Sequence, residues 1–221
     1  MAQAKIVAVA NLKGGAGKST TTCNVAAAAE GADIRTAIID IDPEQQAAAR
    51  WKDGRAAERP TVHSAVYTRI LQAISEAEEK GAELILIDCP ALATAITTEA
   101  VKVADLVLVP CRTTVQDVQF LTTTAAIAAA YQKPTAVVLN AVELQIKETE
   151  EARAFITNAG LALAPVFLSK AVAYHRAITA GLGVTEFEPN GKAAQETLHL
   201  LGWMSRLLDL PHDTQLEIML A

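Results

Sequence analysis

A glycine-rich segment with two lysines is the stretch of this sequence best suited to chemistry. It reads Lys13-Gly14-Gly15-Ala16-Gly17-Lys18-Ser19-Thr20. Glycines let successive backbone N–H groups point at one spot and cradle phosphate oxygens, and the N-terminus of a following helix attracts the same anions. Lys18 is placed to reach the β- and γ-phosphates of a nucleotide, and Ser19 to hold Mg²⁺. The alternative is a glycine-rich turn with incidental lysines, but strand, loop, helix, Lys and Ser all occupy the places that a phosphate loop requires.

Asp40 and Asp42, on either side of Ile41 and directly before Pro43, are candidates for binding Mg²⁺ and water. Residues two apart in an extended segment share a side, so both carboxylates can face a bound phosphate. We expect Asp40 in the outer shell of Mg²⁺ and Asp42 to orient or activate the attacking water. The alternative for each is a cap on a helix that starts at Pro43, because Asp before Pro is a common helix start.

A further aspartate, Asp88, ends the apolar run Leu84–Asp88 and is followed by Cys89 and Pro90. An apolar strand that closes on Asp is the Walker-B form, whose carboxylate holds Mg²⁺ through water. The carboxyl ends of parallel strands meet at the ligand crevice, so Asp88 is expected to point into the same crevice as Asp40. Cys89 is interpreted as a small buried apolar residue rather than a reactive thiol.

These residues need a scaffold, and the sequence predicts one in which apolar runs alternate with alanine-rich helical stretches. The predicted strands are Ile6–Ala10, Thr36–Asp40, Val62–Val66, Leu84–Asp88, Leu106–Pro110, Ala136–Asn140 and Leu163–Phe167. The predicted helices are Lys18–Glu30, Glu44–Ala57, Arg69–Lys80, Thr94–Val103, Gln116–Tyr131, Glu148–Ala159, Ala171–Ala180 and Lys192–Leu210. Continuous Val/Ile/Leu strands are typical of a parallel sheet buried on both faces. The order predicts the α/β class: a three-layer sandwich with a mostly parallel twisted sheet, of the P-loop NTPase type.

The length and composition support a single domain over residues 1–221, which the phosphate loop predicts to be a P-loop ATPase domain, with 211–221 as a loose tail after Pro211. The chain has 221 residues, of which 51% are hydrophobic and 20% charged, and a net charge of −6, which excludes a disordered chain. We find neither an apolar window long enough to span a membrane nor a signal-peptide pattern. Cys23, Cys89 and Cys111 are odd in number and widely spaced, which supports neither a disulfide framework nor a zinc cluster, so a reducing cytoplasm is expected.

Together, Lys13, the phosphate loop, the D-x-D-P segment and Asp88 resemble the deviant Walker-A ATPases, the family of ParA, MinD and the nitrogenase iron protein. The general pattern G-x-x-x-x-G-K-[ST] expects its first glycine at position 12, where this chain has Leu12, and the rest matches the tighter K-G-G-x-G-K-[ST]. The resemblance implies that ATP and Mg²⁺ bind. It also implies that Lys13 reaches across an ATP-sandwich homodimer to the partner's phosphates, as an arginine finger does. The alternative is a lysine at the strand end that stabilises only its own loop.

The resemblance, which extends from Lys5 to about Leu208, completes the expected set of site residues. The catalytic residues are Lys13, Lys18 and Asp42. The nucleotide-binding residues are Lys13, Gly14, Gly15, Ala16, Gly17, Lys18, Ser19, Thr20 and Asn140. The Mg²⁺ ligands are Ser19, Asp40 and Asp88, with the aspartates acting through water. Asn140 closes a predicted strand where relatives read the adenine edge, and its alternative is an Asx turn. Asp117 belongs either to a switch or dimer-contact loop or simply to a helix N-terminus.

Within the family the chain resembles the small ParA type, similar to ParF. Only twelve residues precede Lys13, too few for the helix-turn-helix domain of larger ParA proteins. The last helix is not basic, unlike the membrane helix of MinD. The contexts of Cys89 and Cys111 do not match the cluster ligands of the iron protein. We therefore expect a plasmid or chromosome segregation ATPase that hydrolyses ATP slowly when alone. Its expected partners are a ParB-type centromere-binding protein and non-specific DNA, with no membrane, in the cytoplasm and on the nucleoid when ATP is bound.

Charge gives this expectation of DNA binding little support, since the pI is near 5.3. A dimer would have to assemble a local basic patch. The candidates are Arg50, Lys52, Arg55, Arg59, Lys170, Arg176 and Lys192. A solvated helix face is the alternative for the first four. Three other functions stay open: a positioning ATPase for a protein cargo such as chemoreceptors or carboxysomes, a non-enzymatic nucleotide-binding adaptor, and a metabolic P-loop enzyme of the dethiobiotin-synthetase type, against which Lys13 speaks.

Overall fold

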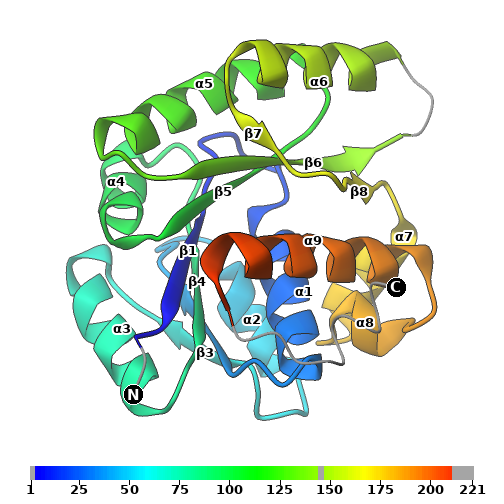
Figure 1. Cartoon of the computed structure of the whole chain (residues 1–221). Helices are drawn as coiled ribbons and strands as arrows, with labels where there is room; N and C mark the ends of the chain where they lie inside the picture. Colours follow the sequence, from blue (N-terminus) through cyan, green and yellow to red (C-terminus); the bar gives the residue numbers. More distant parts are fainter. Residues whose placement is uncertain (1–2, 144–146, 211–221) are drawn as a thin grey trace.

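The backbone forms a parallel sheet enclosed between two layers of helices (Figure 1). The computed structural model describes residues 3–143 and 147–210, so the tail expected at 211–221 lies outside the described residues. The predicted α/β class and three-layer arrangement are confirmed. Among the described helices, none combines the length and the apolar character needed to cross a bilayer.

The sheet places its first strand in the middle. The strands are β1 (Lys5–Val9), β2 (Thr36–Asp40), β3 (Thr61–Ser64), β4 (Leu84–Asp88), β5 (Leu106–Cys111), β6 (Thr135–Val142), β7 (Ala162–Leu163) and β8 (Leu168–Ser169). Their order is β3-β2-β4-β1-β5-β6-β7, with β8 paired to β6. Since β1 lies between β4 and β5, the loop that follows it emerges where the carboxyl ends of the central strands meet. The register sets Asp40 of β2 directly opposite Asp88 of β4.

Each face of the sheet has its own set of helices (Figure 1). One face is covered by α1 (Lys18–Gly31), α2 (Ala47–Asp53), α7 (Val172–Thr179), α8 (Val184–Phe187) and α9 (Lys192–Leu208). The other is covered by α3 (Ile70–Glu79), α4 (Thr94–Val103), α5 (Val115–Ala130) and α6 (Lys147–Asn158), with a 3₁₀ turn at Tyr67–Arg69 before α3. Two separate hydrophobic cores therefore lie on opposite sides of one sheet.

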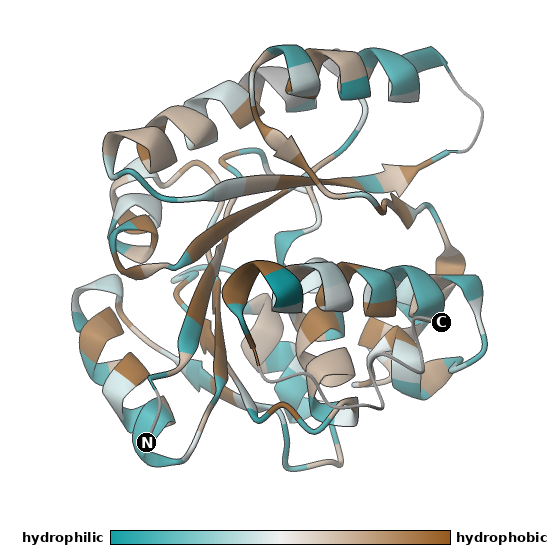
Figure 2. Cartoon of the chain, viewed as in Figure 1, coloured by the Kyte–Doolittle hydropathy of each residue, from teal (hydrophilic) through white to brown (hydrophobic). Residues whose placement is uncertain are grey.

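The central strands are apolar on both faces because they feed both cores. On β2, for example, Ile38 packs in the core of α1 and Ile39 in the core of α3. Figure 2 shows the strands as mostly brown ribbons, whereas the helices mix brown and teal. In α1 the run Ala26–Ala29 is almost fully buried. Small side chains at these positions let the helix that follows the phosphate loop pack closely between the sheet and α9.

The structure corrects two predicted elements and adds one. Of the predicted strand Leu163–Phe167, only Leu163 is in a strand: β7 ends there and β8 begins after Phe167, because Pro165 between them has no N–H to give to a ladder. The predicted helix Glu44–Ala57 is only Ala47–Asp53, since residues 43–45 form a turn and Gln46 has a φ of 44°. The four-residue helix α8 is too short to leave a helical period in the sequence.

Candidate functional site

The segment between β1 and α1 is a tight loop whose shape depends on two glycines. Gly15 has a φ of 72° and Gly17 a φ of 97°, in the left-handed region that favours glycine. A Cβ on Gly17 would lie 1.9 Å from the side-chain nitrogen of Asn140, so a side chain does not fit there. Gly17 is also the N-cap residue of α1, so the loop opens onto the N-terminus of a buried helix. This is the geometry of a phosphate-binding loop.

Asn11 fixes the start of the loop, and the sequence reasoning missed it. Its side chain is fully buried, and its Nδ2 donates to the carbonyl of Pro110 on β5 at 2.8 Å. Its Oδ1 accepts the backbone N–H of Lys13 at 2.9 Å. A single polar residue at the end of an apolar strand was the available signal, because a buried amide must find partners. The loop is thereby tied to the neighbouring strand.

The two lysines of the loop occupy different environments. Lys18 is buried, and its Nζ donates to the carbonyl of Lys13 at 3.4 Å. Burial lowers the pKa of Lys18, although the nearby charge of Asp88 acts in the opposite direction. Lys13 is half-buried, and its Nζ lies 5.8 Å from the centre of the Phe120 ring on α5. Lys18 therefore points into the site, whereas Lys13 rests against α5.

Asp88 and Asp40 form a buried acidic pair below the loop. Both residues are 1% exposed, on strand positions paired in register. The hydroxyl groups of Ser19 and Thr22 donate to the Asp88 carboxylate. Burial raises the pKa of Asp88 to about 7, and the charge of Asp40 adds to the effect. Burial also raises the pKa of Asp40. Such a pair of oxygen ligands is suited to a hard divalent cation.

The backbone contacts of Asp40 and Asp42 show that only Asp40 caps a helix. Oδ2 of Asp40 accepts the N–H groups of Ala48 and Ala49, both at 3.1 Å, so Asp40 caps α2. Its Oδ1 accepts the N–H of Asp42 at 3.0 Å. Oδ1 of Asp42 accepts the N–H groups of Glu44 and Gln45, both at 2.9 Å. The alternative in which both aspartates cap a helix that starts at Pro43 is therefore wrong for Asp42, which caps only a turn, whereas Asp40 does cap the helix that follows.

One pocket of about 230 Å³ joins Asp42 to the phosphate loop. It is lined by Gly14, Gly15, Gly17, Lys18, Ser19, Thr20, Asp42, Gln45, Ala47, Cys89 and Ala91. The structure thus brings together most of the predicted catalytic and phosphate-binding residues around one space. Asp40 borders an adjacent groove of about 300 Å³, while the side chain of Ala16, within the loop, is buried. Lys13 is not part of the lining of this pocket.

Asn140, predicted to contact adenine, lies on β6 beside the loop. Its Nδ2 donates to the carbonyl of Ala16 at 2.8 Å. Ala141, the next residue, helps to line a larger cavity of about 530 Å³. The rest of that lining is Arg112, Thr113, Thr114, Glu143, Glu148 and Lys170. The adenine contact stays a prediction; the structure shows Asn140 bracing the phosphate loop.

Asp117 occupies the first turn of α5. Thr114 caps this helix: its Oγ1 accepts the N–H of Asp117 at 3.3 Å and donates to Asp117 Oδ2. Asp117 is only 3% exposed. These contacts are those of a helix N-terminal residue, which was the simpler of the two interpretations.

Cys23, Cys89 and Cys111 are all buried free thiols. Burial raises the pKa of each of them. Cys89 lines the pocket but is only 1% exposed. The raised pKa makes it a poor nucleophile at neutral pH, in keeping with the interpretation of Cys89 as a small packing residue.

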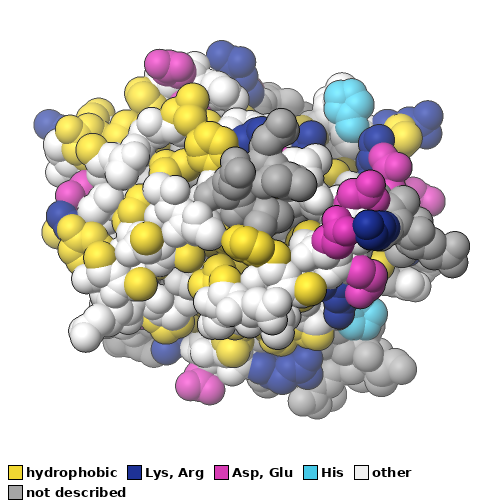
Figure 3. All heavy atoms as spheres, turned by 90° about the horizontal axis from the view of Figure 1, so that it is seen from above, with side chains coloured by type: hydrophobic (Ala, Val, Ile, Leu, Met, Phe, Trp, Pro, Cys, Tyr) yellow, Lys and Arg dark blue, Asp and Glu magenta, His cyan; other side chains and the backbone are white. Residues whose placement is uncertain are grey.

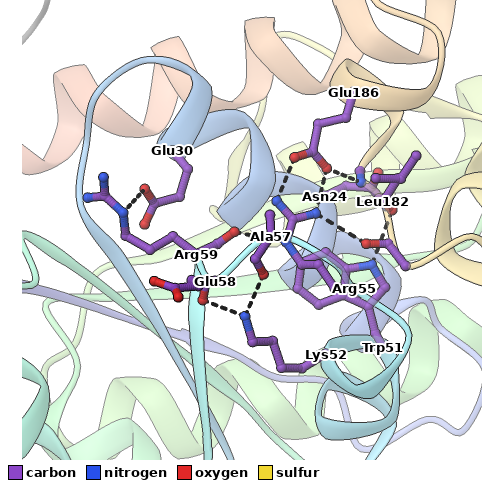
Figure 4. A network of polar contacts seen from close by, with 12 residues as sticks. Asn24, Glu30, Trp51, Lys52, Arg55, Ala57, Glu58, Arg59, Leu182 and Glu186 are labelled. Carbon is purple, nitrogen blue, oxygen red and sulfur yellow. Dashed lines mark hydrogen bonds and ion pairs between the residues drawn. The ribbon is translucent and has the colours of Figure 1, made fainter.

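The basic residues expected to bind DNA do not form one free patch. The Arg55 side chain is 2% exposed and paired with Glu186, so this candidate is not a free surface cation, nor does it lie on a solvated helix face (Figure 4). Lys52 donates to backbone carbonyls and Arg59 lies 3.7 Å from Glu30, as Figure 4 also shows. Lys170 and Lys192 pair with Glu143 and Glu196, whereas Arg50 and Arg176 are exposed.

The face formed by α5 and α6 also carries no single basic patch among the described residues. In Figure 3 the lysine and arginine side chains are scattered, and acidic side chains gather at the right-hand end. The exposed residues at the start of α6 are Lys147, Glu148, Glu150 and Glu151. Like charges on DNA and on this end of the face would repel each other.

A buried lysine, a glycine-framed loop and paired carboxylates at the centre of a parallel sheet define a nucleotide-binding site of the P-loop class. The chain matches the CobQ/CobB/MinD/ParA nucleotide binding domain over residues 7–184 and belongs to this family. The resemblance drawn from Lys13 and the D-x-D-P segment is thereby confirmed at the level of the family.

Two curated relatives match along most of the chain. The Maintenance of carboxysome distribution protein A of Halothiobacillus neapolitanus is 25% identical over 201 residues, which cover 87% of this chain and 92% of that protein. The protein of the same name from Gloeobacter kilaueensis is 29% identical over 195 residues, covering 87% and 88%. The Chromosome partitioning protein ParA of Caulobacter vibrioides is 29% identical over 147 residues but covers only 48% of this chain.

Solved structures show the same fold. A Cyanothece McdA variant in complex with ATP superposes with a TM-score of 0.76 and 16% identity, over 97% of this chain and 100% of that one. The Mg-ADP complex of the septum site-determining protein MinD from Pyrococcus horikoshii has a TM-score of 0.73 and 16% identity, over 92% and 97% of the two chains.

Proposed function

We propose that this protein is an ATPase that positions a large protein cargo within the cell. The observation that carries the ATPase part is the pocket that joins Lys18 and Ser19 to Asp42. A cation for phosphate oxygens, a hydroxyl for a metal and a carboxylate for water are the groups that ATP hydrolysis needs. Asp88 supports the same function from below, since it accepts a hydrogen bond from Ser19.

The residues of the site fit a magnesium nucleotide. Ser19 and Asp88, with Asp40 opposite, would hold Mg²⁺ as a hydroxyl ligand and water-mediated carboxylates. The pKa of each buried aspartate is raised because burial disfavours its negative charge, and a divalent cation beside the pair would stabilise that charge. Bound Mg²⁺ would neutralise charge on the β- and γ-phosphates. The loop N–H groups and Lys18 would orient the phosphates, and the free edge of the Asp42 carboxylate would orient the attacking water.

Lys13 supports a proposed dimer. Its Nζ lies over Phe120 and outside the lining of the phosphate pocket, so within one chain it is not directed at the phosphates. A second copy docked over the pocket would offer it an anionic target across the interface. This agrees with the role that the family resemblance implies for Lys13, and it explains why a second cation accompanies Lys18 in the loop.

The cargo part of the proposal rests on the relatives. Both carboxysome distribution proteins align with 87% of this chain, whereas the chromosome partitioning protein aligns with less than half. This favours a protein body such as a carboxysome as cargo over the DNA segregation and the ParB-type partner that we first expected. The pairing of Arg55 with Glu186, and the scattered cations on the α5–α6 face that Figure 3 shows, give no support to a DNA-binding patch at either of these two places.

Two measurements test the proposal. Phosphate release from Mg·ATP by the purified protein, with Lys18→Ala as control, tests the ATPase part; no release above that control contradicts it. Deletion of the gene in its own host, with fluorescent labels on protein bodies and on DNA, tests the cargo part. Clumped or unevenly inherited protein bodies support it, whereas loss of a plasmid or uneven chromosome segregation with normal protein bodies refutes it.

A further inference from the structure

An ion pair with a buried arginine joins the end of α2 to the segment before and within α8 (Figure 4). Arg55 lies two residues beyond α2, and its Nη1 and Nη2 donate to Oε2 and Oε1 of Glu186 at 2.7 and 2.5 Å. Nη1 also donates to the carbonyl of Gly181 at 3.2 Å, and Nε donates to the carbonyl of Arg59 at 2.8 Å. The guanidinium is thus held on three sides, in the planar forked geometry that lysine cannot reproduce.

The same segment is tied to α2 and α1 by two further side chains. Trp51 of α2 is 3% exposed, its ring lies 5.0 Å from the Arg55 guanidinium carbon, and its Nε1 donates to the carbonyl of Leu182 at 3.1 Å. Asn24 of α1 accepts the N–H of Val184 at 2.8 Å. Residues 181–186 therefore form a fixed anchor for the C-terminal end of α2.

The other end of α2 is held at the candidate active site. Asp40 caps the helix through Ala48 and Ala49, and the same carboxylate accepts the N–H of Asp42. The helix has seven residues, or about 10 Å of length, and buries only Ala48 and Trp51. A helix with so little apolar contact takes its orientation from its two polar ends. A change at Arg55 is therefore transmitted over about two turns to the turn that carries Asp42.

We propose that the Arg55–Glu186 ion pair is a positioning device for Asp42: it sets the orientation of α2 and, through it, the place of the carboxylate that orients water. This inference rests on the proposed ATPase function. The Arg55 side chain is 2% exposed and that of Glu186 is 32% exposed, so the pair adds little net stability over a well-matched replacement, but it can define one geometry among several. Burial favours the neutral form of Glu186, yet the hydrogen bonds from Arg55 and the Gly183 N–H outweigh it and hold the pKa of Glu186 below its usual value.

The test separates positioning from simple stabilisation. Glu186→Gln keeps the size of the side chain and removes its charge. We expect its kcat for ATP hydrolysis to fall about tenfold, while the Kd for ATP changes less than twofold, because the phosphate loop is untouched. Glu83→Gln is the matched control, because Glu83 also accepts a hydrogen bond from an arginine, Arg35, at 3.2 Å. Arg35 directly precedes the first residue of β2, whereas Asp40 is the last residue of that strand. The control should leave both constants unchanged.

Amide hydrogen exchange of α2 gives a readout that does not need hydrolysis. In Glu186→Gln the N–H groups of Ala48 and Ala49 should exchange at least tenfold faster, with α1 unchanged. A fall in kcat without faster exchange of α2, faster exchange with a normal kcat, or a Kd that rises in step with the loss of kcat overturns the inference. If Glu186→Gln does not fold, Trp51→Phe, which removes the N–H to Leu182, takes its place with the same expectations. A wild-type protein that does not hydrolyse ATP refutes the proposed function, whereas normal hydrolysis by a folded Glu186→Gln refutes only this inference.

Discussion

Replacing Asp42 by two different residues separates its chemical role from its structural one. Asp42→Ala removes both the charge and the acceptor for the Glu44 and Gln45 N–H groups, which lie 2.9 Å from Oδ1. Asp42→Asn keeps a side-chain oxygen for these two bonds and removes only the charge. Loss of such a cap costs about 1 kcal/mol, or about 2–4 °C in Tm for a chain of this size. Loss of a water-orienting base lowers turnover by about 10²–10⁴, equivalent to about 3–5 kcal/mol.

We therefore expect both variants to lose turnover to a similar extent, but only Asp42→Ala to melt at a lower temperature. Both should still bind ATP and accumulate as a long-lived ATP-bound dimer. The assay is phosphate release in single-turnover conditions, with the Tm measured on the same samples. Near-normal turnover of Asp42→Asn would refute the reasoning, because the carboxylate would then serve only the turn. The water-orienting role would then pass to Asp40, whose oxygens already accept three backbone N–H groups.

Three further outcomes are expected. Lys13→Ala should bind ATP but fail to dimerise when ATP is bound, whereas the affinity of Lys18→Ala for ATP should fall at least tenfold. Light scattering in the presence of ATP measures the dimer, and binding titrations measure the affinity. A normal ATP-dependent dimer of Lys13→Ala would contradict the cross-subunit role. Because the pKa of Asp88 is raised to about 7, the folded chain keeps a proton that the unfolded chain has lost above about pH 4. The free energy of unfolding without nucleotide should therefore fall from about pH 4 to about pH 7, relative to that of Asp88→Asn. The affinity for Mg·ATP should rise by up to about tenfold per pH unit over the upper part of this range, because the cation needs the ionised carboxylate. Thermal melts and binding titrations in which the wild type and Asp88→Asn do not differ would contradict the raised pKa of Asp88. Gly17→Ala should lower the free energy of unfolding by about 1–3 kcal/mol and abolish ATP binding, since the φ of Gly17 is 97° and a Cβ there would lie 1.9 Å from the side-chain nitrogen of Asn140. The control is Gly31→Ala, which has open space around it and should change neither stability nor binding appreciably in the same melts and titrations.

Much of this fold was predictable because its strands are buried on both faces. The bounds of β2 and β4 agree with the prediction to the residue, since a continuous apolar run ends where Asp40 or Asp88 must reach the crevice. The phosphate loop was equally clear, because glycine, lysine and serine are each required at one place. Such signals are local: one residue type at one spacing suffices.

The remaining features depend on contacts between distant segments, which no local pattern reveals. In the sequence, Arg55 looks like any exposed cation near the end of a helix. Only the structure shows that Glu186, far along the chain, pairs with it and that its side chain is buried. The cap on α2 comes from Asp40 because residues 43–45 turn before the helix begins. The only sign of the role of Asn11 in the sequence is that it is polar and follows an apolar strand. Its partner, the carbonyl of Pro110, lies on another strand.

Because all three thiols are buried, their reaction with a thiol reagent can measure local unfolding of the native chain. Cys23, Cys89 and Cys111 lie in different parts of the interior, at 1%, 1% and 0% exposure, so a thiol reagent can react only when the surrounding layer opens. The rate of labelling at each site, read by mass spectrometry, therefore reports separately the free energy of opening at the buried side of α1, beside the nucleotide pocket and under α5. A fluorophore placed on an added surface cysteine would, for the same reason, mark that position alone, which allows the pairing of two chains to be followed without removing any native residue.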